Sequence, residues 1–313
     1  MVSSKGRIAV VGTGVIGISW AACFLAHGYE VAATDPAPGA EARLRKRVEY
    51  FWPAMEHMGL AEGASPERLT FHEQLPAAVE GAVFIQENGP ERVEIKRETM
   101  KQIDAAAPVD TVIATSSSGI RISDIQDAAT HPERILLGHP FNPPHLIPLV
   151  EVVGGRLTSL EAIEHAMQFY RGIGKKPILL QKEIKGHIAN RLQAALWREA
   201  FHLVEQGVAS VNDIDTAIAH GPGLRWALLG PFMNLHLSGG EGGIRHVLEH
   251  LGPPIEEWWQ DLGEVRLTTE LIARFAQGME EEIGNNKLED IVRDRDAILL
   301  DMLSQKVKSR LIP

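Results

Sequence analysis

The sequence predicts an α/β protein with a Rossmann-type doubly wound sheet, followed by a smaller all-helical domain. Short apolar runs alternate with helix-like stretches from Arg7 onward, and a G-x-G-x-x-G motif directly follows the first run. After residue 185, no run with the length and composition of a strand is left. Because alternating strands and helices form parallel sheets, we expect a dinucleotide-binding domain over residues 1–185 and a helical domain over residues 186–313.

The composition limits the kinds of partner. A chain of 313 residues is long enough for two domains. Its 31 Lys and Arg residues are outnumbered by 41 Asp and Glu residues, which gives a formal net charge of -10. This balance argues against nucleic acid or an anionic membrane as a partner, since both attract clustered positive charge. No stretch reaches the roughly 18 apolar residues of a membrane-spanning helix.

Cysteine usage and the N-terminus indicate the compartment. Cys23 is the only cysteine, so no disulfide framework can form within the chain. The first residues lead directly into a strand and lack the pattern of a secretory signal peptide. We therefore expect a cytoplasmic protein.

The first strand and its glycine-rich turn predict a dinucleotide site. The run Arg7–Val11 is followed by Gly12, Gly14 and Gly17, and then by a helix-like stretch over residues 18–27. The glycines permit a tight turn and the close approach of a pyrophosphate, and the helix N-terminus supplies amides for its phosphates. A lone motif of this kind is a weak signal, and its alternative is an ordinary turn between strand and helix. The strand before it and the helix after it favour the dinucleotide site.

The second strand predicts which dinucleotide is bound. It covers residues 29–34 and ends at Asp35, where a carboxylate could accept hydrogen bonds from the ribose hydroxyls. Residues 36–39 offer no cation for a 2'-phosphate, so NAD is favoured over NADP. The helix expected over residues 40–58 carries the basic run Arg43–Arg47. We interpret this run as a solvated helix face, with a landing site for ligand phosphates as the alternative.

Polar residues follow the next strands, which are expected over residues 69–75 and 82–86. Glu91 lies in the turn after the second of these strands, and Lys96 lies in the charged helix that follows. Ligands of an open α/β sheet bind beyond the carboxyl ends of its strands. Glu91 and Lys96 could therefore face the nicotinamide half of a cofactor, or they could form a pair on the helix surface.

A group of small hydroxylated residues ends the following strand. The strand covers residues 111–114, and Ser118 belongs to the Thr115–Gly119 segment after it. These residues could form a turn with a helix cap. They could also place a hydroxyl group beside the cofactor.

The stretch Gly138–Val153 carries the strongest signal for catalysis. His139 closes a buried-type strand, and two proline-rich turns that hold Asn142 restrict the backbone after it. Glu151 stands within the apolar run that follows, where a carboxylate needs a partner. We expect His139 and Glu151 to pair, which would hold the imidazole in one tautomer and make it a better base. The alternative is a capped strand end with an acid at a sheet edge.

The remaining chain predicts one short strand and then helices. Residues 177–180 form the strand, and helices are expected over residues 188–205, 211–220, 232–237, 242–251, 267–283 and 288–306. Asn190 lies among apolar residues of the first helix, and such an amide would find partners at a cleft between domains. His246 and His250 have helical spacing, but no third ligand is evident, so we expect no metal site.

Together these residues resemble the 3-hydroxyacyl-CoA dehydrogenase superfamily over nearly the whole chain. The most specific elements are H-x-F-N-P…L-V-E-V, which begins at His139, and G-x-I-x-N-R-L over Gly186–Leu192. The resemblance implies NAD as the cofactor, His139 as the catalytic base and Glu151 as the acid that orients it. It also implies a homodimer formed mainly through the helical domain, which would bind substrate as well.

The resemblance assigns roles to further residues. The substrate-contacting residues of the family match Ser118, Asn190 and the pocket-forming Asn142. Its cofactor-contacting residues match Asp35, Glu91 and Lys96. The presence of Ser118 and Asn190 together with His139 and Glu151 favours an enzyme over two alternatives, a crystallin-like structural protein and an NAD-sensing binding module, because a purely structural role does not need this combination.

Within the superfamily, the chain differs from acyl-CoA enzymes in two places. Its helical arm after the second strand is shorter and less rich in lysine, and the link over residues 221–232 is longer. The longer link is similar to that of the branch of L-carnitine dehydrogenases, lambda-crystallin and L-gulonate 3-dehydrogenases. We rank L-carnitine first as substrate, other small 3-hydroxy acids such as L-gulonate second, and a 3-hydroxyacyl-CoA third.

Arg225, within the longer link, is the candidate cation for the substrate carboxylate. A guanidinium matches a carboxylate with two hydrogen bonds. Its alternative is a surface ion pair. The trimethylammonium group of carnitine would need aromatic faces, and the candidates are Phe141, Trp197, Trp226 and Phe232, although aromatic residues at helical spacing are commonly core.

Overall fold

The computed structural model describes residues 5–309 and 311–312. The first four residues, on which the prediction about a signal peptide partly rests, lie outside this range. The chain divides into two compact units, residues 1–191 and 192–313. The division falls within helix α6 (Ala189–Glu205), whereas the sequence analysis places the boundary at residue 185.

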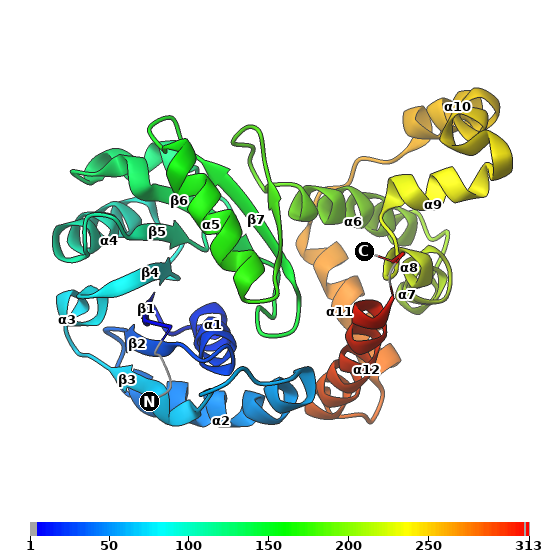
Figure 1. Cartoon of the computed structure of the whole chain (residues 1–313). Helices are drawn as coiled ribbons and strands as arrows, with labels where there is room; N and C mark the ends of the chain where they lie inside the picture. The colour runs from blue at the N-terminus through cyan, green and yellow to red at the C-terminus, as the bar shows by residue number, and fades with distance from the viewer. Residues whose placement is uncertain (1–4, 310, 313) are drawn as a thin grey trace. The chain divides into compact units, whose positions relative to one another are not determined.

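The first unit is built on one eight-stranded sheet with the order β3-β2-β1-β4-β5-β6-β7-β8 (Figure 1). Its strands are β1 (Arg7–Val11), β2 (Glu30–Thr34), β3 (Leu69–Phe71), β4 (Ala82–Glu87), β5 (Val112–Thr115), β6 (Ile135–Pro140), β7 (Leu149–Gly154) and β8 (Lys176–Leu179). The chain runs outward from β1 to β3 and then returns to place β4 on the other side of β1. Such a reversal opens a crevice at the carboxyl ends of the strands, where α/β proteins bind ligands.

The sheet is parallel except at one pair. β6 and β7 run antiparallel, and their register places His139 directly opposite Glu151. The prediction of a Rossmann-type sheet is confirmed, but β7 does not extend it in the parallel direction. The reason is the short connection over residues 141–148, since a parallel crossover needs a dozen or more residues.

Helices lie on both faces of this sheet. They are α1 (Val15–Ala26), α2 (Ala40–Met58), α3 (Leu75–Val79), α4 (Val93–Ala106) and α5 (Leu160–Gly172). Short 3-10 turns cover Pro66–Arg68, Ile122–Asp124, Gln126–Ala128 and Pro132–Arg134. Helix α5 is not among the predicted helices, although Ser159 caps it by accepting a hydrogen bond from the Ala162 amide. Ser followed by a stretch with helical spacing is a usual start signal.

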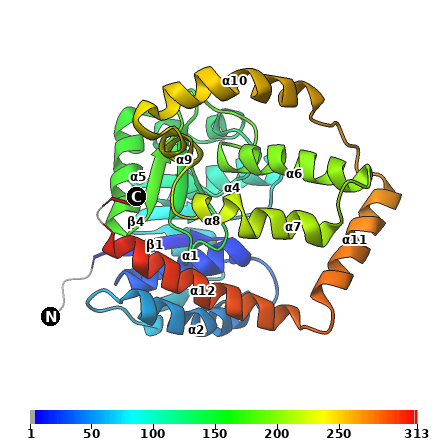
Figure 2. The same ribbon diagram turned by 90° about the vertical axis from the view of Figure 1, so that its right-hand side faces the viewer.

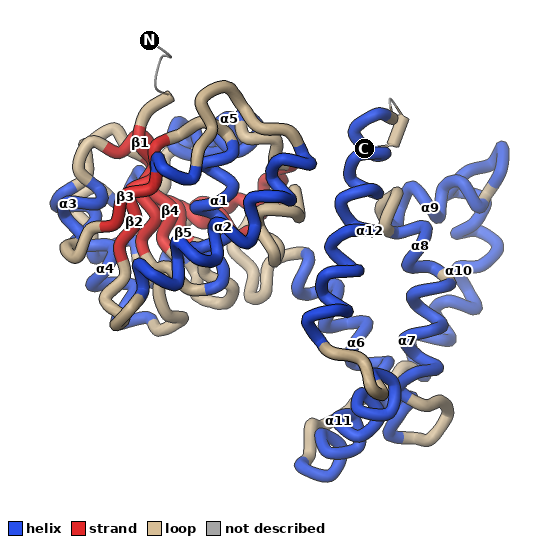
Figure 3. The backbone as a smooth tube through the Cα atoms, turned by 90° about the horizontal axis from the view of Figure 1, so that it is seen from below, coloured by secondary structure: helices blue, strands red, loops and turns tan. Residues whose placement is uncertain are grey.

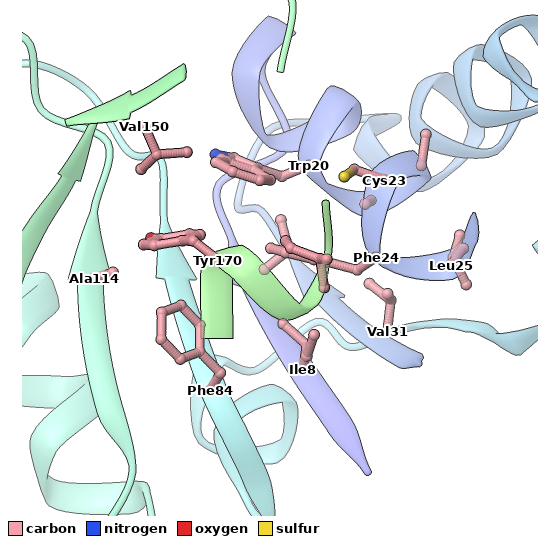
Figure 4. Packing of buried hydrophobic residues seen from close by; sticks show 14 of the residues in the cluster. Ile8, Trp20, Cys23, Phe24, Leu25, Val31, Phe84, Ala114, Val150 and Tyr170 are labelled. Atoms are coloured by element: carbon pink, nitrogen blue, oxygen red, sulfur yellow. The ribbon is translucent and has the colours of Figure 1, made fainter. Parts of the chain in front are cut away.

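Alternation along the strands divides the core into two layers. Ile8 and Val10 of β1 face a cluster that includes residues of α1, α2 and α5, whereas Ala9 and Val11 face a cluster that includes residues of α3 and α4. In the first cluster, stacked and tilted rings of α1, β4 and α5 pack together, among them Trp20, Phe24, Phe84 and Tyr170 (Figure 4). Each buried side chain of this size stabilises the fold by about 1.5–3 kcal/mol.

The second unit consists of helices and loops in the part of the chain that the structure describes (Figures 2 and 3). After α6 come α7 (Val211–His220), α8 (Pro222–Trp226), α9 (Pro231–Ser238), a 3-10 turn (Gly240–Gly242), α10 (Gly243–Asp261), α11 (Thr269–Ile283) and α12 (Leu288–Lys308). The prediction of an all-helical second part is confirmed. Two details differ, because α8 was not expected and α10 continues through Pro253 and Pro254. The fixed φ of proline is itself helical, so the helix can pass them despite the lost donors.

The second unit buries few apolar side chains. Among its described residues, the buried apolar side chains are those of Val204, Val247 and Leu271. Large apolar side chains such as Phe232 (78%) and Trp259 (66%) are mostly exposed. Across the described residues of the whole chain, none of the helices combines the length and apolar character that crossing a membrane requires.

Candidate active site

Three side chains, from the loop after β5 and from strands β6 and β7, form a hydrogen-bonded relay. His139 Nδ1 lies 3.0 Å from Glu151 Oε2, and His139 Nε2 lies 3.1 Å from Ser118 Oγ. His139 is 5% exposed and Glu151 is fully buried. The antiparallel register of β6 and β7 brings the first two together, and the loop after β5 brings Ser118 to them. We refer to Ser118, His139 and Glu151 as the relay.

The partners of His139 determine where its proton lies. The carboxylate of Glu151 only accepts hydrogen bonds, so Nδ1 carries the proton and donates it. Nε2 then carries no proton, and it accepts a hydrogen bond from the Ser118 hydroxyl. An imidazole held in this way presents a base on its Ser118 side and stabilises a positive charge through Glu151.

Glu151 has a second role at the end of the first unit. Its Oε1 accepts hydrogen bonds from the amides of Ile188 (2.7 Å) and Ala189 (3.0 Å), where α6 begins. Burial by itself raises the pKa of Glu151, but the hydrogen bonds from His139 and these two amides lower it below its ordinary value. The carboxylate therefore stays ionised beside His139.

Glu91 supports the loop that carries Ser118. Its Oε1 accepts hydrogen bonds from Ser117 Oγ (2.7 Å), the Gly119 amide (2.7 Å) and the Ile120 amide (3.1 Å). Burial raises the pKa of Glu91, and these hydrogen bonds outweigh it, so the pKa is lowered. The alternative of an ion pair between Glu91 and Lys96 on the helix surface is wrong, because the carboxylate is engaged with the loop.

Lys96 is buried rather than presented on the helix surface. Only 1% of its surface is exposed, and its Nζ lies 2.8 Å from Oε2 of the fully buried Glu87. Nζ also donates to the Gly89 carbonyl, and Thr115 Oγ1 donates to the same carboxylate. Glu87 is not among the site residues predicted from the sequence. Its position as the last residue of an apolar strand, directly before a polar turn, is the signal that could have indicated it.

A pocket of about 770 Å³ lies at the carboxyl ends of the strands beside the glycine-rich turn. Gly12 has a φ of 87° and lies against the Asn88 backbone, where a Cβ would lie 2.8 Å from a carbonyl oxygen. A Cβ on Gly17 would lie 1.9 Å from the Gly12 oxygen, so Gly17 allows α1 to approach the turn. Gly14, at the start of α1, has no heavy atom within 4 Å of a Cβ position. A phosphate group can therefore come close to the first amides of this helix.

Asp35 lines the same pocket at the end of β2. Its Oδ2 accepts hydrogen bonds from the amide (2.6 Å) and the hydroxyl group of Thr13, and its Oδ1 accepts one from the Ala37 amide. The carboxylate is thus fixed at the place where the sequence pattern locates a ribose. The residues present fit NAD, because they offer open helix amides for phosphates and an acceptor for a diol.

A buried network that the sequence analysis missed connects the pocket to the strand of His139. The Gln86 amide nitrogen donates to Ser116 Oγ (2.8 Å) and to the Gly138 carbonyl (3.2 Å), and its oxygen accepts from the Tyr170 hydroxyl (2.7 Å). Ser116 in turn donates to Asn88, which lies against Gly12. A fully satisfied network of this kind specifies one arrangement of the polar groups.

Among the described residues, the side chains of the other predicted substrate residues form no hydrogen bond or ion pair with the relay. Asn142 is exposed in the loop between β6 and β7, which Lys175 holds through the Ile147 carbonyl (3.2 Å). Asn190 is half-buried in the first turn of α6, and Arg225 is exposed on α8 of the second unit.

The basic run on α2 behaves as a helix face. Arg45 pairs with Glu41 at 2.8 Å, and the Arg47 guanidinium lies 4.9 Å from the centre of the Tyr50 ring. On α10, the rings of His246 and His250 lie 4.1 Å apart. Among the residues that the structure describes, no three His, Cys, Asp or Glu side chains are grouped so that they could hold a metal ion.

A dinucleotide pocket beside an acid–base relay, on a doubly wound sheet, defines the class of NAD-dependent oxidoreductases. Two family models specify it further. The NAD binding domain of 3-hydroxyacyl-CoA dehydrogenase matches residues 7–184, and the C-terminal domain of 3-hydroxyacyl-CoA dehydrogenase matches residues 186–275. The chain belongs to the 3-hydroxyacyl-CoA dehydrogenase family, and it is an NAD-dependent dehydrogenase.

Relatives of known function resemble the chain along most of its length. L-carnitine dehydrogenase of Streptomyces coelicolor is 50% identical over 297 residues, which cover 95% of this chain and 93% of the relative. L-carnitine dehydrogenase of Bacillus cereus is 48% identical over 301 residues, with 96% and 92% covered.

Solved structures share the fold. A 5-formyl-3-hydroxy-2-methylpyridine 4-carboxylic acid 5-dehydrogenase, described as an NAD+-dependent dismutase, has a TM-score of 0.81 at 27% identity, covering 94% of this chain and 96% of its own. The 3-hydroxybutyryl-CoA dehydrogenase of Escherichia coli K12 has a TM-score of 0.64 at 27% identity, with 81% of this chain and 53% of its own covered. The predicted family and cofactor are confirmed.

Proposed function

We propose that the chain oxidises the 3-hydroxyl group of L-carnitine to give 3-dehydrocarnitine, with NAD+ as the hydride acceptor. The observation that carries the chemistry is the buried relay, in which His139 presents an unprotonated Nε2 toward Ser118 on a dinucleotide-binding sheet. L-carnitine dehydrogenases about half identical to this chain over nearly its whole length support the choice of substrate.

In the proposed mechanism, His139 is the general base. Its Nε2 takes the proton of the substrate hydroxyl while hydride leaves carbon 3, and bound NAD+ supplies the acceptor for that hydride. With substrate bound, the Ser118 hydroxyl donates its one proton to the substrate oxygen instead of to Nε2, and this hydrogen bond directs the oxygen toward Nε2. Glu151 stabilises the imidazolium that His139 becomes, because its ionised carboxylate accepts the Nδ1 proton in a hydrogen bond.

We assign the cofactor residues by what their positions allow. Gly12, Gly14 and Gly17 let the phosphates approach the start of α1, and Asp35 accepts hydrogen bonds from a ribose diol. Glu91 and Lys96 remain proposed cofactor residues, but their contacts within the chain indicate an indirect role. They hold the loop after β5 and the end of β4 against which the nicotinamide half would lie.

For the substrate itself, we propose contacts with Ser118, Asn142, Asn190 and Arg225. Arg225 would hold the carboxylate of carnitine, since its exposed guanidinium has no ion pair among the described residues. Replacing Arg225 by Met should raise KM for carnitine roughly 10- to 100-fold, because a charged hydrogen bond contributes about 1.5–3 kcal/mol. Arg245→Met, an exposed arginine of α10, is the matched control. Equal KM values in both variants would remove Arg225 from the site.

We also propose a homodimer formed mainly through the helical unit, in the cytoplasm. The mostly exposed Phe232 and Trp259 support it, because a soluble monomer rarely exposes so many large apolar side chains. The single buried Cys23 suits a reducing compartment. Light scattering at micromolar concentration should give twice the mass of one chain, and the mass of a single chain would contradict the proposal.

One assay tests the function directly. Initial rates of NADH formation should be highest with L-carnitine, lower with L-gulonate and lowest with L-3-hydroxybutyryl-CoA. High activity with the thioester and none with carnitine would replace the proposed substrate by an acyl-CoA. Absence of turnover with all three, despite NADH binding, would instead favour a structural or NAD-sensing protein.

A further inference from the structure

A second histidine lies against the relay. The ring centres of His187 and His139 are 4.8 Å apart, and His187 Nε2 lies 3.2 Å from the carbonyl oxygen of Ser117, the residue before Ser118. The next two residues donate their amides to Glu151. The short segment 187–189 therefore touches or adjoins every member of the relay, and none of the proposed chemical steps uses His187.

The backbone at His187 indicates that its side chain matters. His187 has a φ of 50°, and it is the one residue other than glycine with positive φ in the part of the chain that the structure describes. Such a conformation costs about 1–3 kcal/mol and is concentrated at functional sites. Glycine would adopt it without that cost. The imidazole at this position is therefore maintained against a conformational penalty.

The surroundings of His187 determine its protonation state. The Ser117 carbonyl can only accept a hydrogen bond, so Nε2 carries the proton. Nδ1 is buried, and no described residue offers it a partner. A second proton there would create a buried donor without an acceptor and a cation beside His139. The geometry thus favours the neutral ring with its proton on Nε2.

Burial and nearby charges also favour the neutral form of His187. Burial lowers the pKa of His187, and the charge of His139 lowers it further. The hydrogen bond to Ser117 and the carboxylates of Glu151 and Glu91 oppose this shift, but the pKa remains below its ordinary value. A cavity about the size of one water molecule adjoins the ring. Its charged lining residues, Arg121 and Glu183, are engaged with Asp124 and Ser123.

We propose that His187 is a positioning residue of the relay and acts as the neutral imidazole with its proton on Nε2. By donating to the Ser117 carbonyl, it fixes the loop that holds Ser118 Oγ 3.1 Å from His139. By staying neutral, it leaves His139 free to become the cation when it takes the substrate proton. The catalytic consequence rests on the proposed function, whereas the tautomer does not.

Nitrogen NMR of the wild-type chain with labelled histidines tests the tautomer without any substrate. The signals of His187 are assigned by their absence in His187→Asn. We expect Nε2 protonated and Nδ1 bare at pH 7. A charged ring or an Nδ1–H tautomer at pH 7 would overturn the proposal, whether or not carnitine is the substrate.

Kinetics then test the positioning role. His187→Phe keeps a ring beside His139 but cannot donate to Ser117, whereas His187→Asn tolerates positive φ and can donate. We expect kcat to fall roughly 10- to 100-fold in the Phe variant. The Asn variant should have a kcat between those of the Phe variant and the wild type. His165→Phe, an exposed position on α5, is the control and should leave kcat unchanged.

Binding separates positioning from a general structural defect. The dissociation constant of NADH, followed by its fluorescence, should stay within about twofold of wild type in both variants, because His187 touches the relay and not the glycine-rich turn. Wild-type kcat in His187→Phe, or no recovery in His187→Asn, would overturn the positioning role. If a variant fails to fold, the tautomer measured in the wild type still decides the proposal. If the wild type turns over no 3-hydroxy acid, the proposed function fails while the NMR result stands.

Discussion

The two units of the chain differ in how their polar and apolar groups are satisfied. In the first unit, most buried polar groups have partners in close geometry, as in the pair of Lys96 with Glu87 and the relay of His139 with Glu151, and Nδ1 of His187 is an exception. Two apolar layers enclose the sheet that carries them. In the second unit, large apolar side chains such as Trp258 (62%) remain exposed, and few of the described ones are buried.

This difference indicates that the first unit determines the chemistry and the second unit determines assembly. A relay that must hold atoms within a few tenths of an ångström requires a rigid scaffold with satisfied hydrogen bonds. Exposed apolar helices have the opposite property, because they gain stability only when another surface covers them. We therefore expect substitutions in the first unit to change catalysis or local stability, and changes in the second unit to depend on concentration.

The largest effect is expected at the centre of the first unit. Replacing His139 by Ala removes the base and should lower kcat about 10²- to 10⁴-fold. NADH binding should be retained, since His139 does not line the dinucleotide pocket. His165→Ala on the exposed face of α5 is the control. Near-normal turnover in His139→Ala would place the base elsewhere.

A buried ion pair behind the sheet should have a large effect on stability alone. Asp104 accepts hydrogen bonds from Arg134 (2.7 Å) and from the amide of Thr130. Burial raises the pKa of Asp104, but these hydrogen bonds and those from His131 lower it overall. Asp104→Asn should reduce the free energy of unfolding at pH 7 by about 3 kcal/mol, because it leaves Arg134 buried without its counter-charge.

The stability lost in Asp104→Asn should depend on pH in one direction. A carboxyl group whose pKa is lowered in the folded state stabilises the fold above its unfolded pKa, and this contribution is lost as the pH falls through the folded pKa. The difference between Asp104→Asn and wild type should therefore be largest near neutrality and shrink in acid. Urea titrations at pH 7 and at about pH 3 measure it, and a difference that grows in acid would contradict the assignment.

A smaller effect is expected at the cofactor pocket. Asp35→Ala should lower kcat/KM for NAD and raise it for NADP, because the carboxylate that would repel a 2'-phosphate is gone. The NAD preference should fall about tenfold or more, which corresponds to roughly 1.4 kcal/mol. Asp110→Ala, an exposed position before β5, controls for the loss of one negative charge. An unchanged preference would mean that Asp35 does not face the ribose.

Much of the first unit could be predicted because its signals are local. An acid inside the apolar run of β7 needs a partner, and this need predicts the pairing of Glu151 with His139. The same reasoning could have been applied to Glu87, which ends an apolar strand, but Lys96 was matched to Glu91 instead. The antiparallel course of β7 was also available from the sequence, since the connection over residues 141–148 is too short for a crossover.

Other features depend on contacts that no local pattern contains. His187 follows Gly186 at the start of a helix, where a histidine gives no signal of a ring packed on His139. Gln86 looks like the polar end of a strand, yet its amide joins α5 to the loop after β5 through Tyr170 and Ser116. These contacts arise only when distant segments meet, so the sequence predicts the reacting groups better than the groups that hold them.

The smallest expected effect is a dependence of Tm on protein concentration, which arises from the second unit. It tests directly whether the two units differ as described. If the exposed apolar helices are covered by a second copy, folding and association are linked, and the thermal midpoint Tm must rise with protein concentration. A tenfold change in concentration corresponds to about 1.4 kcal/mol, so Tm should shift by roughly 1–2 °C for each tenfold in a chain of this length. Scanning calorimetry from micromolar concentrations upward, together with light scattering, measures both quantities. A first-unit substitution such as Asp104→Asn should lower Tm at every concentration without changing this slope, because it does not alter the apolar helices. A Tm independent of concentration, with the mass of a single chain, would show that the helical unit is stable without a partner copy.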